Sequence, residues 1–161
     1  MTTDKLLFKH DEQWDAEKLY NIWAAIEDIA KEMEIDYYPP QFEVISAEQM
    51  IDAYTSVAMP VMYKHWSFGK SFIQQDHAYK NGQMGLAYEV VINSNPAIAY
   101  LMETNSITMQ ALVMAHASVG HSAVFKNNYL FKTWTDASAI IDYLIYAKNY
   151  IKKCEERYGD E

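Results

Sequence analysis

The sequence predicts a mainly α-helical fold with a minor β element, of the α+β class. In it, a long buried central helix is flanked by amphipathic helices and a small sheet. Half of the 161 residues are hydrophobic and 22% are charged, a balance typical of a globular protein with a sizeable core. Helical periodicity covers several long stretches, whereas strand-like stretches are few and short. The length suits one domain, so we expect residues 1–13 to form a flexible arm and residues 14–161 a single domain.

The first amphipathic helix is expected over residues 14–33. Apolar side chains recur there at steps of three and four, and Asp11 or Asp15 could cap the start of the helix. Pro39 and Pro40 follow it, and proline cannot continue a helix. The predicted apolar face consists of Leu19, Ile22, Ile26, Ile29 and Met33.

Two shorter elements are expected after the prolines. Residues 42–45, "FEVI", fit a short strand. Ser46 and Gln49 then match a capping box at the start of a helix that runs to about residue 57. Pro60 and Gly69 interrupt the following stretch, so we expect a loop or edge element that leads into a helix over about residues 70–80.

The strongest strand signal lies in residues 86–92, "LAYEVVI", which are rich in β-branched and aromatic side chains. The Asn81–Gly82 pair before it indicates a turn. After the strand, Asn95 and Pro96 fit the N-cap and first position of a helix through "AIAYLME".

A long apolar helix is predicted over residues 107–119. Because it is apolar on nearly every side, we expect it to be buried, with His116 in the interior beside hydrogen-bond partners or a metal. A last amphipathic helix is expected to begin at a cap formed by Thr135 or Asp136 and to run to about Tyr158.

His116 and His121 are the most distinctive polar residues of the central helix. Five helical steps of about 100° leave two side chains about 140° apart, so an α-helix would not bring these rings together. Zinc-binding helices of the H-E-x-x-H type use a spacing of four, and Ala117 stands here in place of the glutamate. The rings could still converge if the helix ends or bulges at Gly120; otherwise both histidines are packed and hydrogen-bonded.

Two acidic residues are candidates for catalysis together with His116. Glu89 lies inside the apolar strand signal, so it is either at an exposed edge or buried with a partner. Glu103 lies next to a predicted break between helices and has the same two interpretations.

His65, within "KHWSFGKSF", is a third candidate metal ligand beside His116 and His121, although a histidine among aromatics is more often structural. The other polar candidates are Asn105, which could equally be a cap, and the polar run after the helix, Lys126, Asn127 and Asn128.

Charge and cysteine content restrict the function classes. The net charge of −9 argues against a non-specific nucleic-acid surface. Cys154 is the single cysteine, so no disulfide framework or cysteine-rich zinc site can form. The first residues lack the apolar core of a signal peptide and no stretch has the length of a membrane span, so we expect a cytoplasmic protein.

Several long segments resemble the N-terminal region of the bacterial SpoVR family, the stage V sporulation protein R-like proteins. They include "MPVMYKHWSFGKSF", "GLAYEVVINSNPAIAYLMETNSITMQALVMAHASVGHSAVFKNNYLF" and "TWTDASAIIDYLIYAKNYI". The resemblance extends from about Trp14 to Gly159. Members of the family are usually much longer, which implies that the C-terminal region of a longer chain is missing here.

The resemblance implies a role in sporulation, through formation of the spore cortex, or in stress physiology. It names no settled activity, so two functions stay open. The first is a divergent metal-dependent or acid/base hydrolase-like site with a zinc-like divalent ion. The second is a non-enzymatic regulatory or scaffold protein that binds the partners implied by the family's gene neighbourhood, a PrkA-type serine kinase and a von Willebrand A-like (VWA-like) protein.

Overall fold

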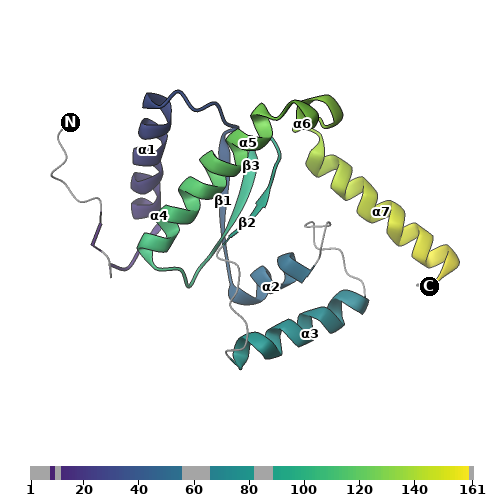
Figure 1. Ribbon diagram of the computed structural model, residues 1–161. Helices are drawn as coiled ribbons and strands as arrows, with labels where there is room; N and C mark the ends of the chain where they lie inside the picture. Colours follow the sequence, from purple (N-terminus) through teal and green to yellow (C-terminus); the bar gives the residue numbers. More distant parts are fainter. Residues whose placement is uncertain (1–7, 10–11, 56–65, 82–88, 160–161) are drawn as a thin grey trace.

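A small sheet with helices on both faces forms the body of the molecule (Figure 1). The computed structural model describes residues 8–9, 12–55, 66–81 and 89–159. Within them, helices predominate and the sheet has three strands, which confirms the predicted class of mainly α with a minor β element. The predicted turn at Asn81–Gly82 and the predicted loop around Pro60 lie largely outside the described residues.

The strand order of the sheet is β1-β3-β2. Strand β1 (Pro40–Ile45) pairs in parallel with β3 (Ala97–Met102), and β2 (Glu89–Ile92) pairs antiparallel with β3, with Glu89 opposite Leu101. Glu89 therefore lies at the start of an edge strand of the described sheet.

Strand β3 is the element for which the sequence prediction was wrong. Asn95 and Pro96 do not start a helix but end the connection that turns β2 back into β3. A short apolar run such as "AIAYLM" fits a buried strand as well as a buried helix, because periodicity cannot separate the two. Pairing on both sides, with β1 and β2, decides in favour of the strand.

The two faces of the sheet bury separate hydrophobic clusters, because successive side chains of β3 point to opposite faces. Leu101 packs with residues of α1 (Ala16–Glu32) and α4 (Ile107–Ala115). Met102 packs on the other side with residues of α2 (Ala47–Thr55), which in turn contacts α3 (Trp66–Lys80).

Two helices, α1 and α2, begin at side-chain caps that the sequence predicted. Asp15 accepts a hydrogen bond from the Lys18 amide at 2.9 Å and so begins α1. Ser46 and Gln49 form the predicted capping box, with reciprocal bonds of 2.9 and 3.2 Å between side chain and amide.

The central helix is a continuous run of α4, the π-helix η1 (His116–His121) and α5 (Ser122–Asn127). Its inner side packs on α1, β3 and β2, whereas its outer side carries the exposed apolar residues Leu112 and Val124. The expectation that His116 is interior was wrong: its side chain is 60% exposed. Apolar composition alone did not reveal that the described residues cover one side of this helix only.

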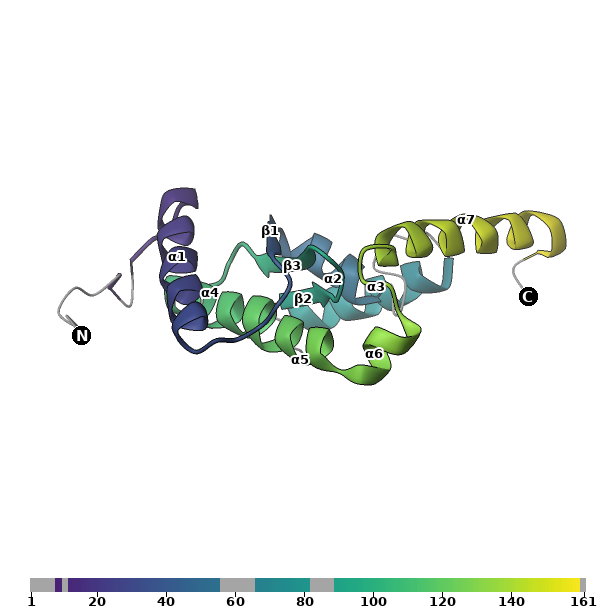
Figure 2. The same ribbon diagram turned by 90° about the horizontal axis from the view of Figure 1, so that it is seen from above.

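The C-terminal helices leave the body of the molecule (Figure 2). Helix α6 (Tyr129–Trp134) was not expected, and α7 (Ile140–Tyr158) ends where predicted. The predicted caps of α7 were wrong, because its N-cap is Ala139 and Asp136 instead accepts from the Ser138 amide in the preceding turn. No residue of α7 is buried. Among the described residues, no helix has the length and hydropathy required to cross a membrane.

Candidate metal centre

A widened helical turn brings His116 and His121 together. In a π-helix the backbone hydrogen bonds join residues five apart, so residues at that spacing come to lie over one another, which an α-helix does not allow. Helix η1 begins at His116 and ends at His121, and the two ring centroids lie 4.5 Å apart with an interplanar angle of 63°. Gly120 has a helical backbone conformation and no positive φ angle. The bulge therefore arises from the wider π turn and not from a glycine in the left-handed region.

Glu89 reaches the two histidines from the edge strand. Helix η1 lies against β2, and one carboxylate oxygen of Glu89, Oε1, is in direct contact with Nδ1 of His116. The Glu89 side chain is only 14% exposed. Glu89 thus combines parts of both sequence interpretations: it lies on an edge strand, and its half-buried side chain has a partner in His116.

The three side chains form a group with the composition of a metal site. One potential ligand atom from each of Glu89, His116 and His121 lies within 4.8 Å of the others. Two imidazoles and one carboxylate are the protein ligands of one well-known type of catalytic zinc site. Among the described residues, this is the one group of three or more His, Cys, Asp or Glu side chains that lie close enough together to hold a metal ion.

The environment of Glu89 fits a cation nearby. Its second carboxylate oxygen, Oε2, is buried and has no hydrogen-bond partner among the described residues. An ionised carboxylate that is shielded from water and incompletely hydrogen-bonded is destabilised unless a positive charge lies close to it. A metal ion bound by the adjacent imidazoles would supply that charge, as would a protonated imidazole.

The same contact also permits acid/base chemistry without a metal. A carboxylate that accepts a hydrogen bond from Nδ1 orients the ring and leaves Nε2 free to accept a proton, as in hydrolases with a carboxylate–histidine pair. His116 has the exposure that such a role requires.

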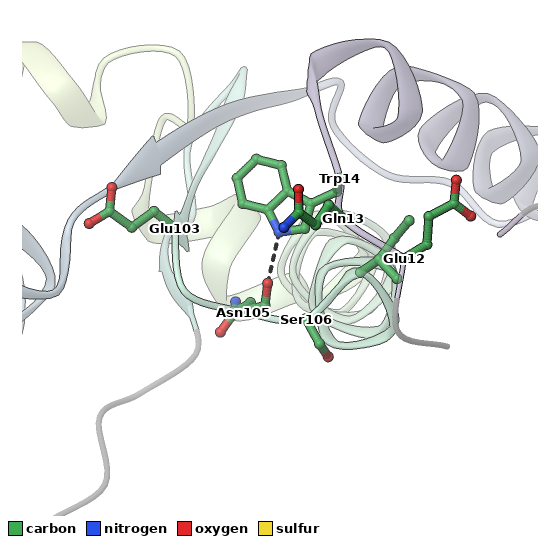
Figure 3. Close-up of a pocket in the computed structure, with 7 residues that line it drawn as sticks. Glu12, Gln13, Trp14, Glu103, Asn105 and Ser106 are labelled. Carbon is green, nitrogen blue, oxygen red and sulfur yellow. Dashed lines mark hydrogen bonds between the residues drawn. The ribbon is translucent and has the colours of Figure 1, made fainter. Parts of the chain in front are cut away.

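Glu103 and Asn105 belong to a different part of the molecule. They line a cavity of about 470 Å³ together with Glu12, Trp14 and three neighbours. Figure 3 shows the Trp14 indole in this cavity, donating from Nε1 to the backbone oxygen of Asn105 at 2.7 Å. An ion pair with Lys18 lowers the pKa of Glu12, the other carboxylate that lines this cavity.

The polar run after η1 fastens the central helix to the loop before β1. Lys126 Nζ contacts Asp36 Oδ1 at 2.6 Å and Asn127 Nδ2 donates to the Asp36 backbone oxygen at 2.8 Å. Asn128 caps α6 by accepting from the amides of Leu130 and Phe131. These contacts give the three residues structural partners outside the Glu89–His116–His121 group.

The sequence did not predict two residues whose hydrogen bonds join the central helix to the loop before β1. Asp36 is one, and Ser122, whose Oγ accepts from the Tyr38 amide at 2.8 Å, is the other. Neither position has a pattern in the sequence that predicts a contact across more than 80 residues. His65, the remaining predicted ligand, lies outside the described residues.

Comparison with known proteins identifies the family of the chain. The family model described as "SpoVR like protein" matches residues 13–161. The uncharacterized protein YcgB of Escherichia coli (strain K12) is 60% identical over 159 residues, which is 99% of this chain and 31% of that protein. The chain thus spans about a third of the length of the curated relative it matches, and no solved structure matches it. The chain belongs to the SpoVR-like protein family.

Proposed function

We propose that Glu89, His116 and His121 form a divalent metal site of the zinc type and that this site serves a hydrolytic reaction. The observation that carries the proposal is the π turn, because it brings two imidazoles five residues apart together beside one half-buried carboxylate. π turns of this kind are frequent at functional sites.

The residues have distinct tasks in this proposal. When bound, a zinc-type ion supplies a Lewis acid and a water molecule of lowered pKa. His116, which is exposed, and His121, which is half-buried, offer imidazole ligands, and a substrate could reach the exposed ring. Glu89 contributes the negative charge that offsets the ion and holds His116 in place.

Amide bonds of a peptide or of a peptidoglycan precursor are the substrate class we favour. This choice rests on the association of the SpoVR family with spore cortex formation or stress physiology.

Calorimetric titration with Zn²⁺ tests the metal site. We expect one ion per chain, and a loss of affinity of at least a hundredfold in His116→Ala and in His121→Ala. His77→Ala is the matched control, since His77 is an exposed histidine of α3. Equal binding by all four proteins, or none by the wild type, would remove the proposal.

A second candidate function is a non-enzymatic scaffold that binds a PrkA-type kinase and a VWA-like protein. The observation that favours it is the exposed aromatic surface of α6 and α7. Trp134 is 81% exposed, and Tyr143 and Tyr146 are each 67% exposed. Large exposed aromatics on one segment are typical of protein-binding surfaces.

Capture of the purified kinase and of the VWA-like protein on the immobilised chain tests this second function. The triple variant Trp134→Ser, Tyr143→Ser, Tyr146→Ser is expected to lose binding. Tyr20→Ser, at an exposed aromatic of α1, is the control and is expected to bind normally. Capture of neither protein by the wild type would eliminate the scaffold function for these partners.

A further inference from the structure

The two edges of the His116 ring have different surroundings. Nδ1 is in contact with Glu89 Oε1. The other edge carries Nε2 and the adjacent carbon Cδ2, and Cδ2 lies 3.7 Å from the position that a Cβ on Gly120 would take. The Nε2 edge therefore faces a helical position that has no side chain.

Neither packing nor backbone conformation among the described residues explains the glycine. Gly120 is exposed and helical, and apart from its chain neighbours and the His116 ring, an added Cβ would approach only the Ala115 carbonyl oxygen, at 4.0 Å. Alanine is favoured over glycine at a helical position. Room beside the histidine ring is what the glycine provides, as expected where a ligand comes close to the backbone.

The contact between Glu89 and His116 also limits where an ion can bind. Two nitrogen or oxygen ligands of one tetrahedral zinc ion lie about 3.4 Å apart, given bonds of about 2.1 Å. Glu89 Oε1 is in direct contact with His116 Nδ1. The carboxylate oxygen therefore takes the position that an ion on Nδ1 would occupy.

The exposed fractions of the two side chains also indicate that the ion does not bind on the Glu89 side of the ring. The Glu89 side chain is 14% exposed and that of His116 is 60% exposed, so the carboxylate lies on the inner side of the ring. Metal-ligating histidines commonly donate their second ring N–H to such a carboxylate, which fixes the ring and its tautomer.

We infer that Glu89 is a positioning residue that accepts the Nδ1–H of His116, and that the ion binds Nε2 of His116 and a ring nitrogen of His121 on the side left open by Gly120. This inference rests on the proposed metal site and specifies its geometry. Catalytic zinc sites have three protein ligands and one position for water, so two imidazoles leave one position for water and one for a third ligand.

Nuclear magnetic resonance of the chain labelled with ¹⁵N-histidine and loaded with ¹¹³Cd²⁺ identifies the bonded nitrogens. We expect scalar coupling between cadmium and Nε2 of His116, coupling to one nitrogen of His121, and a protonated Nδ1 on His116. Coupling at Nδ1 of His116 would overturn the inference but not the metal site. No coupling to either histidine would overturn both.

Substitution of Glu89 gives an independent readout. Glutamine keeps an oxygen that accepts from Nδ1–H, so Glu89→Gln is expected to weaken Zn²⁺ binding by about 10- to 100-fold and Glu89→Ala by more. Glu103→Gln is the control and should leave affinity unchanged. A loss in Glu89→Gln as large as that in His116→Ala would identify Glu89 as a direct ligand and contradict the inference.

The open side is tested at Gly120. Gly120→Leu places a side chain beside the Nε2 edge and is expected to lower Zn²⁺ affinity at least tenfold with an unchanged circular dichroism spectrum. Val124→Leu alters an exposed position one turn later and serves as the control. Equal affinity of both variants, with both folded, would show that the ion does not bind on this side.

Discussion

His116 and His121 are five residues apart in one helix, and their ring centroids lie 4.5 Å apart because the helix makes a π turn between them. The same turn places both rings beside Glu89 of the edge strand. A regular α-helix would direct the two side chains about 140° apart. The candidate site therefore depends on one local departure from α-helical geometry.

Removal of one residue from the turn tests this dependence. A π turn contains one residue more than an α turn, so deletion of Gly120 should convert η1 to α-helix without changing the register of α5. The histidines would then be four apart, the spacing of helical zinc sites. We expect Zn²⁺ affinity within tenfold of the wild type, measured by calorimetry.

An insertion in the same turn serves as the comparison for the Gly120 deletion. Insertion of one alanine after Ser118 separates the histidines by six residues, and we expect binding to be lost while helix content by circular dichroism stays similar. If the deletion loses the ion and the insertion keeps it, the π turn is not the origin of the site.

Lys126 and Asn128 are expected to affect stability and not metal binding. Asn128→Ala removes the cap of α6 and should cost about 1 kcal/mol of unfolding free energy. Lys126→Met removes a partly exposed ion pair with Asp36 and should cost about 1 kcal/mol or less. Urea denaturation and Zn²⁺ titration measure the two effects; a hundredfold loss of affinity in either variant would assign that residue to the site.

Ser122 is expected to stabilise the junction between the central helix and the loop before β1. Its hydroxyl is buried and bonds the Tyr38 amide at 2.8 Å. Ser122→Ala leaves that amide without its partner and should lower the unfolding free energy by about 1–3 kcal/mol. The exposed Ser138→Ala is the control in urea denaturation. An equal effect of the two substitutions would show that the bond to Tyr38 contributes nothing.

Alkaline pH should destabilise the fold through Tyr100. Burial, and to a smaller extent Glu43, raises the pKa of Tyr100 above its ordinary value of 10.0. Above about pH 10 the unfolded chain loses this proton before the folded chain does, so the unfolding free energy falls as pH rises towards the folded-state pKa. Below that range the group has no effect.

Denaturant melts between pH 8 and 11 measure this dependence. Tyr100→Phe should have a shallower decline than the wild type, with Tyr129→Phe, at an exposed tyrosine, as control. The Tyr100 variant should keep a residual slope, because burial also raises the pKa of Tyr37. Identical slopes in the wild type and Tyr100→Phe would contradict the assignment.

Local sequence signals predicted most of the fold. Asp15, the Ser46–Gln49 capping box and the periodicity of α7 are short-range features, and the structure confirms them. Strand β3 was missed because its identity depends on pairing with β1, more than 50 residues away. The exposure of His116 was missed for a related reason: it depends on which elements cover the central helix.

The sequence predicted only part of the candidate site. Glu89, His116 and His121 could each be selected by residue type and context, and a bulge at Gly120 was the stated condition for convergence. The contact between β2 and η1 that adds Glu89 to the pair is tertiary, and no spacing in the sequence contains it. For the same reason, the sequence could not separate Glu103, in the Trp14 cavity, from Glu89.

We propose that the π turn creates a metal site from His116 and His121. Anomalous diffraction at the zinc edge, from crystals grown with one equivalent of Zn²⁺, tests it most directly. We expect one strong peak per chain at about 2.1 Å from a ring nitrogen of each of these two histidines. A peak that contacts neither ring, or only one of them, would contradict the claim.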